Sequence, residues 1–180
     1  MASLQKNILI TGLPGSGKTA LIKKLADELQ EYGPAGFFTE EMRLQGIRKG
    51  FKLMSLDRKR TGTLAHADIK GSHRIGKYGV DLEGFERFLG TLPLRDPSTR
   101  LVIIDEIGKM ECLSAKFRDL VASLLDAPAP VIATIAVKSG GFINEVKQRP
   151  GILLYELTER NRDALLPEIA GLIRSLPASR

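Results

Sequence analysis

The sequence predicts an α/β fold in which a mostly parallel central sheet is covered by helices on both faces, with an antiparallel hairpin inserted at about residues 36–70. Apolar runs typical of buried strands alternate with segments whose apolar residues recur at helical spacing, which favours a parallel sheet. Within the insertion, strand-like runs follow one another without a helix. The 180 residues, 43% hydrophobic and 27% charged, fit one globular domain over 1–180.

The first predicted elements are a strand, a loop and a helix. Residues 7–11 form a short apolar strand that leads into a glycine-rich loop, and residues 18–31 carry apolar side chains at helical spacing. Phe37–Leu44 and Gly50–Leu56 are then expected as strands joined across Gln45 and Gly46, with a third strand over Thr61–Ile69.

The second half of the chain continues the alternation of helices and strands. A helix is expected over 82–92, and Leu101–Ile104 is an uninterrupted apolar strand that ends in two acids. The remaining predicted elements are a helix whose apolar stripe runs from 113 to 124, strands over 131–137 and 152–157, and a last helix with apolar positions from 165 to 176.

The glycine-rich loop has the pattern G-x-x-x-x-G-K-[ST] between a strand and a helix, which is typical of a phosphate-binding loop. Glycines let backbone N–H groups turn toward phosphate oxygens, and the helix start adds its positive dipole end. Lys18 is expected to reach the β- and γ-phosphates, and the Thr19 hydroxyl to bind Mg²⁺. The expected phosphate contacts are Gly12, Leu13, Pro14, Gly15, Ser16, Gly17, Lys18, Thr19 and Ala20. The alternative is an ordinary turn, but the flanking elements favour the phosphate site.

A nucleotide-bound metal needs a carboxylate, and the carboxyl end of a neighbouring buried strand is the expected place for it. Asp105 is predicted to hold Mg²⁺ there, and Glu106 to orient a water molecule in line with the γ-phosphorus. The nucleotide site is expected to include Ile104, Asp105, Glu106, Ile107, Gly108, Lys109 and Met110. The alternative is that the two acids only cap the following segment.

Four stretches and a C-terminal motif together resemble the cancer-related (thermostable-type) nucleoside-triphosphatase family. They are residues 12–19, the hairpin 36–43 with Gly50-Phe51, the loop 74–81, the string Ile104 to Glu111, and residues 158–163. This resemblance implies a RecA-like domain that hydrolyses ATP, GTP and other nucleoside triphosphates with Mg²⁺ and little base selectivity.

Three cations outside the phosphate loop are candidates for the same site. Lys109 could reach the γ-phosphate, where a cation stabilises the transferring group, or it is a solvent-facing lysine. The loop with Arg74 could cover the nucleotide and supply an arginine finger; the resemblance favours this interpretation over a basic surface loop. Arg162, at the start of the last helix, could stack on the base or serve only in helix packing. Cys112 is interpreted as a small buried hydrophobe.

Hydrolysis is the leading functional hypothesis, and two alternatives stay open. A small nucleoside or nucleotide kinase also has a phosphate loop and a chain of roughly this length. In a kinase, however, Glu106 would direct water at the γ-phosphate of the donor nucleotide and waste it. A nucleotide-gated module could contact RNA or a protein through the basic hairpin, although the net charge of +6 fits a solvated face better. We expect a cytoplasmic monomer without a membrane partner, since the chain has one cysteine and no long apolar run.

Overall fold

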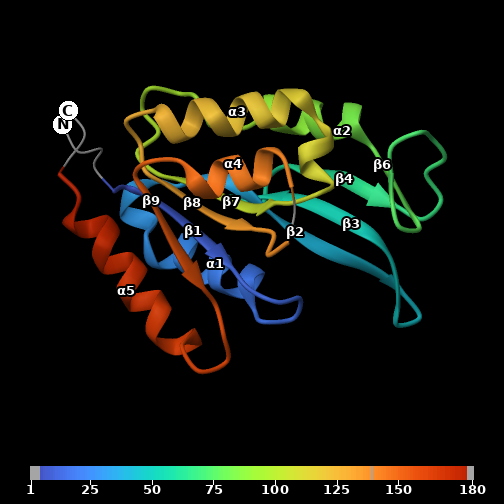
Figure 1. Ribbon diagram of the computed structural model, residues 1–180. Helices are drawn as coiled ribbons and strands as arrows, with labels where there is room; N and C mark the ends of the chain where they lie inside the picture. The colour runs from blue at the N-terminus through green and yellow to red at the C-terminus, as the bar shows by residue number, and fades with distance from the viewer. Residues whose placement is uncertain (1–4, 139, 178–180) are drawn as a thin grey trace.

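The computed structural model describes residues 5–138 and 140–177, which form one nine-stranded sheet with helices on both faces (Figure 1). The strands are β1 (Asn7–Thr11), β2 (Ala35–Leu44), β3 (Ile47–Ser55), β4 (Thr61–His66), β5 (Arg74–Ile75), β6 (Tyr78–Val80), β7 (Val102–Ile107), β8 (Val131–Ile135) and β9 (Ile152–Glu156). The α-helices are α1 (Lys18–Glu28), α2 (Leu82–Gly90), α3 (Ala115–Asp126), α4 (Phe142–Gln148) and α5 (Arg162–Ser175). Short 3-10 helices cover Gln30–Tyr32 and Glu111–Leu113.

The strand order is β5-β6-β4-β3-β2-β7-β8-β1-β9. Strands β2, β7, β8, β1 and β9 run parallel, while β3, β4, β6 and β5 extend the sheet in antiparallel pairs. The predicted fold class is therefore confirmed. Because the carboxyl ends of parallel strands meet at one edge, the loops after β1, β7, β8 and β9 share that edge.

Each face of the parallel half has its own apolar core. Helices α1 and α5 pack on one face, and α2, α3 and α4 lie on the other (Figure 1). Strand β1 shows why both faces are covered, since Ile8 and Ile10 join the first core and Leu9 joins the second. A strand that is buried on both faces has consecutive apolar residues, and this pattern is the one that predicted β1 from the sequence.

The parallel and antiparallel halves meet at β2, which pairs in parallel with β7 and antiparallel with β3. Residues 35–37 of β2 pair with residues 102–104 of β7. At Gly36 the two backbones approach so closely that an added Cβ would lie 1.7 Å from the carbonyl oxygen of Ile103. Glycine is needed here because no side chain fits at that distance.

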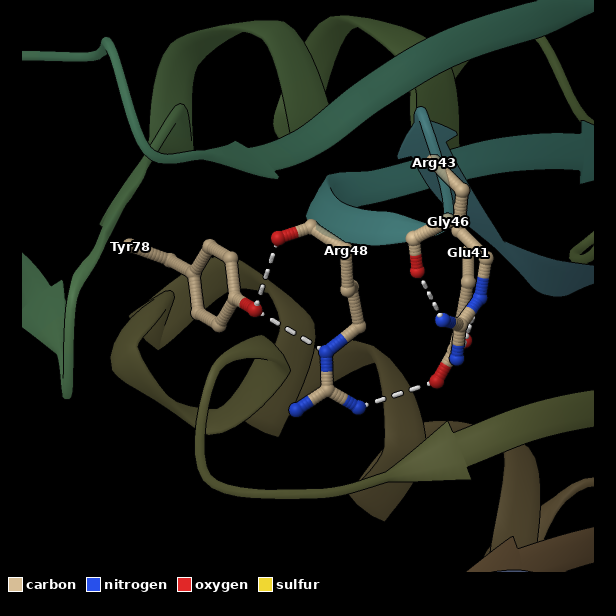
Figure 2. A network of polar contacts seen from close by, with 5 residues as sticks. All are labelled: Glu41, Arg43, Gly46, Arg48 and Tyr78. Atoms are coloured by element: carbon tan, nitrogen blue, oxygen red, sulfur yellow. Dashed lines mark hydrogen bonds and ion pairs between the residues drawn. The ribbon is translucent and has the colours of Figure 1, made fainter.

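The antiparallel half is tied together by a polar network at the β2–β3 hairpin (Figure 2). The Arg48 side chain donates from Nε to the Tyr78 hydroxyl at 2.9 Å and from Nη1 to Glu41 at 2.9 Å. Arg43 also pairs with Glu41, at 2.5 Å. The hydrogen bond from Arg48 lowers the pKa of Tyr78, because the cation favours the phenolate form. The network joins β3 to β6, so the β5–β6 hairpin has a fixed position beside the sheet.

Several element boundaries differ from the sequence prediction. Helix α1 ends at Glu28 and is followed by a 3-10 turn, and the third insertion strand ends at His66 rather than Ile69. Strand β8 ends at Ile135, two residues early. Helix α4 and the β5–β6 pair were not predicted, because seven, two and three residues are too short for a periodic pattern.

The two acids also sit differently from the prediction. They lie inside β7, which runs to Ile107, and not after its end. Within residues 5–138 and 140–177, none of the helices has the length and apolar character needed to cross a membrane. The predicted single domain of 1–180 stays a prediction, and its first four and last three residues lie outside the described ranges.

Candidate functional site

The phosphate loop connects β1 to α1 and is shaped by its glycines. Gly15 and Gly17 have φ values of 80° and 97°, in the left-handed region that side-chain-bearing residues avoid, and Gly17 caps the start of α1. At Gly12, an added Cβ would lie 2.8 Å from the carbonyl oxygen of Leu157. The backbone therefore needs glycine at these positions, which leaves the N–H groups of the loop free of covering side chains.

Lys18 lies against the loop that precedes it. Its ammonium donates to the carbonyl oxygens of Gly12 at 2.8 Å and Leu13 at 3.2 Å. The cation thus lies beside the loop backbone and at the start of α1, where a phosphate chain would also meet the helix dipole.

A metal-nucleotide site of this class needs a hydroxyl and a carboxylate close together, and Thr19 and Asp105 meet this requirement. Thr19 Oγ1 donates to Asp105 Oδ2 at 2.7 Å, and Thr134 Oγ1 of β8 donates to Asp105 Oδ1 at 2.5 Å. Asp105 is 2% exposed, and this burial raises its pKa while the two hydroxyls oppose the rise. The expected meeting of the two motifs is therefore present in the structure.

One detail of that expectation was wrong. Asp105 was predicted on a strand neighbouring β1, whereas β8 lies between β1 and β7. Thr134 on this intervening strand was not identified from the sequence, because a lone threonine in an apolar run carries no signal of its function. The pairing of β7 with β8 shifts register between Ile104 and Ile107, so Asp105 and Glu106 lie outside the regular ladder.

Glu106 is half-buried beside the buried aspartate. Burial raises the pKa of Glu106, the negative charge of Asp105 raises it further, and the positive charge of Lys18 lowers it. A carboxylate with a raised pKa is a better base toward water than an ordinary one. The three side chains therefore form one electrostatic unit at the carboxyl edge of the sheet.

A third acid, Glu111, belongs to this cluster and was missed from the sequence. Its side chain is buried, and both its Oε2 atom and the Glu106 Cγ and Cδ atoms lie against Gly108, at 2.8, 3.5 and 3.5 Å from an added Cβ. Burial and the charge of Glu106 raise the pKa of Glu111 to about 8. Three acids within residues 105–111 after a buried strand are the signal that could have indicated it.

Glu111→Gln should make the protein more stable at alkaline pH. The unfolded glutamate titrates near 4.5 and the folded one near 8, so the folded state favours the protonated form and stability falls as pH rises between these values. Glutamine stays neutral, so the variant should avoid a loss on the order of 4 kcal/mol. Urea unfolding at pH 5, 7 and 9 measures the free energy of unfolding of both proteins. If this free energy falls with pH by the same amount in the variant and in the unchanged protein, the prediction is contradicted.

The remaining predicted residues are placed as follows. Arg162 lies beside the phosphate loop, with its Nε 3.8 Å from an added Cβ on Gly17. The preceding Asn161 fixes this helix start, since it accepts from the Thr158 N–H at 2.8 Å and donates to the Glu156 carbonyl at 2.8 Å. Ala20 is exposed and Met110 half-buried, while Ile104 and Ile107 are fully buried. A nucleotide could therefore meet only the backbone of these two isoleucines.

The other two cations are not seen in contact with the phosphate loop. Arg74 donates to the carbonyl oxygens of Ile69 at 3.0 Å and Lys77 at 2.7 Å, both in its own loop. Lys109 is exposed and lines a cavity with Ile75. Cys112, predicted as buried, is half-buried and lines the same cavity. The catalytic roles of Arg74 and Lys109 stay predictions.

The donor set around Thr19 suits Mg²⁺. A hydroxyl and a carboxylate supply the oxygen ligands that this ion prefers, and nucleotide phosphates and water complete its shell in such sites. In the part of the chain that the structure describes, no group of three or more His, Cys, Asp or Glu side chains could hold a metal.

The fold and the site together define an α/β protein with a phosphate-binding loop facing an acidic strand, the P-loop class. The chain belongs to the NTPase family, whose family model matches residues 7–170.

Relatives and solved structures agree with this assignment. The chain is 47% identical over 93% of its length to the nucleoside-triphosphatase THEP1 of Thermotoga petrophila, of which it covers 92%. It is 36% identical to the human cancer-related nucleoside-triphosphatase, with 96% of this chain and 98% of that protein covered. The crystal structure of THEP1 from Aquifex aeolicus superposes with a TM-score of 0.81 at 36% identity, covering 93% of this chain and 98% of that chain.

Proposed function

We propose that this protein hydrolyses the γ-phosphate of ATP, GTP and other nucleoside triphosphates in a Mg²⁺-dependent reaction with broad base tolerance. The observation that carries the proposal is the 2.7 Å contact between Thr19 of the phosphate loop and Asp105 of the acidic strand. It supports a single site in which phosphate-binding and acidic groups act on one substrate. The names of the relatives, nucleoside-triphosphatases, support the same activity.

The roles of the residues follow from their positions. Lys18 and the loop N–H groups would bind the phosphate oxygens, and Thr19 and Asp105 would hold Mg²⁺, which supplies charge neutralisation to the phosphates. Glu106, with its raised pKa, would orient the attacking water and accept its proton. Arg162, beside Gly17, would lie near the nucleotide. We propose that Arg74 and Lys109 add positive charge only if their loops close over the substrate.

The protein is further proposed to work as a cytoplasmic monomer on a free nucleotide. A free nucleotide suffices for the described site, because the positive charge of Lys18 and the N–H groups of the loop suit the phosphates of one triphosphate. The alternative that the protein is a kinase is tested by the same phosphate-release experiment, through its nucleoside acceptor.

The decisive experiment measures phosphate release from ATP, GTP, CTP and UTP, with Mg²⁺ or with EDTA, and with or without a nucleoside acceptor. We expect Mg²⁺-dependent release from all four nucleotides without an acceptor, because Glu106 would activate a water molecule as the nucleophile. Release only when the acceptor is present, with a phosphorylated nucleoside as product, would select a kinase. Undiminished release in EDTA would refute the metal assignment.

A further inference from the structure

A cavity of about 520 Å³ lies beside the segment that carries Glu106, outside the phosphate loop. It is formed where the chain after β7 meets the starts of α3 and α4 and the β5–β6 hairpin. Its volume is in the range of small-molecule sites. Its lining includes Ile75, Lys109, Cys112, Arg118, Phe142 and Ile143.

The walls of this cavity combine apolar surface with positive charge. Ile75, Phe142 and Ile143 provide the apolar part, and Phe142 offers an aromatic ring. Lys109 and Arg118 provide the cations. Across residues 5–138 and 140–177, neither cation forms an ion pair with a carboxylate, although ten ion pairs occur elsewhere in those ranges.

Arg118 is held in place within the wall. Its Nη1 donates to the Cys112 carbonyl oxygen at 2.6 Å, which leaves the other guanidinium nitrogens available to a ligand. A fixed guanidinium loses little side-chain freedom when it binds an anion. A flat apolar group between Ile75 and Phe142 would add the burial that gives such sites most of their affinity.

From these observations we propose that the cavity binds a small molecule with a planar apolar body and one anionic group, in addition to the nucleoside triphosphate. The anion contacts Arg118, with Lys109 beside it while the Lys109 loop is open, and the planar body lies against Phe142 and Ile75. Lys109 follows Glu106 by three residues, so the ligand sits next to the acidic segment without using the phosphate loop.

Binding is tested with 8-anilinonaphthalene-1-sulfonate, a planar anionic probe whose fluorescence rises in an apolar site. We expect saturable binding that Arg118→Ala and Phe142→Ala each weaken about tenfold, the scale of one lost charge-assisted hydrogen bond or aromatic anchor. Lys116→Ala is the matched control, because this cation lies on α3 two residues earlier, pairs with Glu86 at 2.9 Å and does not line the cavity. The Lys116→Ala variant should bind the probe with the same affinity as the unchanged protein.

Cys112 provides a second readout, since it lines the cavity and is the chain's one cysteine. The bound probe should slow alkylation of Cys112 by iodoacetamide, as followed by intact mass over a long incubation at neutral pH, because burial raises the pKa of this thiol to about 12 and makes the reaction slow. Lys18→Ala should leave probe affinity unchanged, which separates this cavity from the phosphate loop whether or not the protein hydrolyses triphosphates. The proposal is overturned if the probe does not bind, if Lys18→Ala weakens it, or if Arg118→Ala and Cys112 protection show no effect.

Discussion

Replacing Glu106 with Gln is expected to lower nucleoside-triphosphate hydrolysis by about two orders of magnitude or more while nucleotide affinity stays the same. Glutamine keeps the size of the side chain but cannot accept a proton from water. Asp105 and Thr19 keep their contact in this variant, so the metal and phosphate ligands are retained. Single-turnover phosphate release and equilibrium binding of a triphosphate measure the two quantities separately.

Glu83→Gln is the matched control for this experiment. Its side chain is 89% exposed at the start of α2, where it pairs with Arg87 at 3.6 Å. An exposed pair of this kind contributes little to stability, and turnover should match that of the unchanged protein. If Glu106→Gln hydrolyses at the normal rate, Glu106 does not activate the water.

Lys18→Ala is expected to abolish measurable triphosphate binding, the second large effect. Lys18 places its ammonium beside the Gly12 and Leu13 carbonyls, where the phosphates are expected, and its charge also lowers the pKa of Asp105 and Glu106. Its removal takes away a cation that would bind the phosphate oxygens and leaves the two acids without an opposing charge. Titration calorimetry with Mg²⁺ and ATP measures the loss.

The control is Lys24→Ala, an exposed lysine on the same helix, α1, outside the phosphate loop. It tests whether a change in overall charge alone weakens binding, and we expect unchanged affinity. Retained micromolar affinity in Lys18→Ala would show that the loop backbone binds the nucleotide without this side chain.

The site was predictable where its residues are consecutive. The phosphate loop follows an apolar strand, and the Asp105–Glu106 pair stands directly after the apolar run 101–104, so both could be recognised although the pair lies inside β7; Thr19 and Asp105 are in contact. Thr134 and Glu111 could not be assigned in this way. Thr134 acquires its partner through the order of strands, and Glu111 acquires its raised pKa through burial against Glu106. Both effects arise only after folding.

The fold follows the same rule. The periodic helix α3 and the uninterrupted apolar strand β1 were identified, and so was the β2–β3 turn across Gln45 and Gly46. The short β5–β6 pair depends on the Arg48–Tyr78 bond, which joins residues thirty positions apart. The pattern of apolar residues within a short segment does not show which distant residue the segment will contact.

The close approach at Gly36 limits how this molecule can change. A methyl group there would push β2 from β7, and the β5–β6 hairpin with Ile75 would move away together with the strands that carry it. The catalytic acids on β7 and the cavity residue Ile75 would then no longer keep a fixed position relative to each other. The absence of a side chain at Gly36 thus sets the spacing between the part of the sheet that carries the phosphate loop and the acids and the part that carries Ile75.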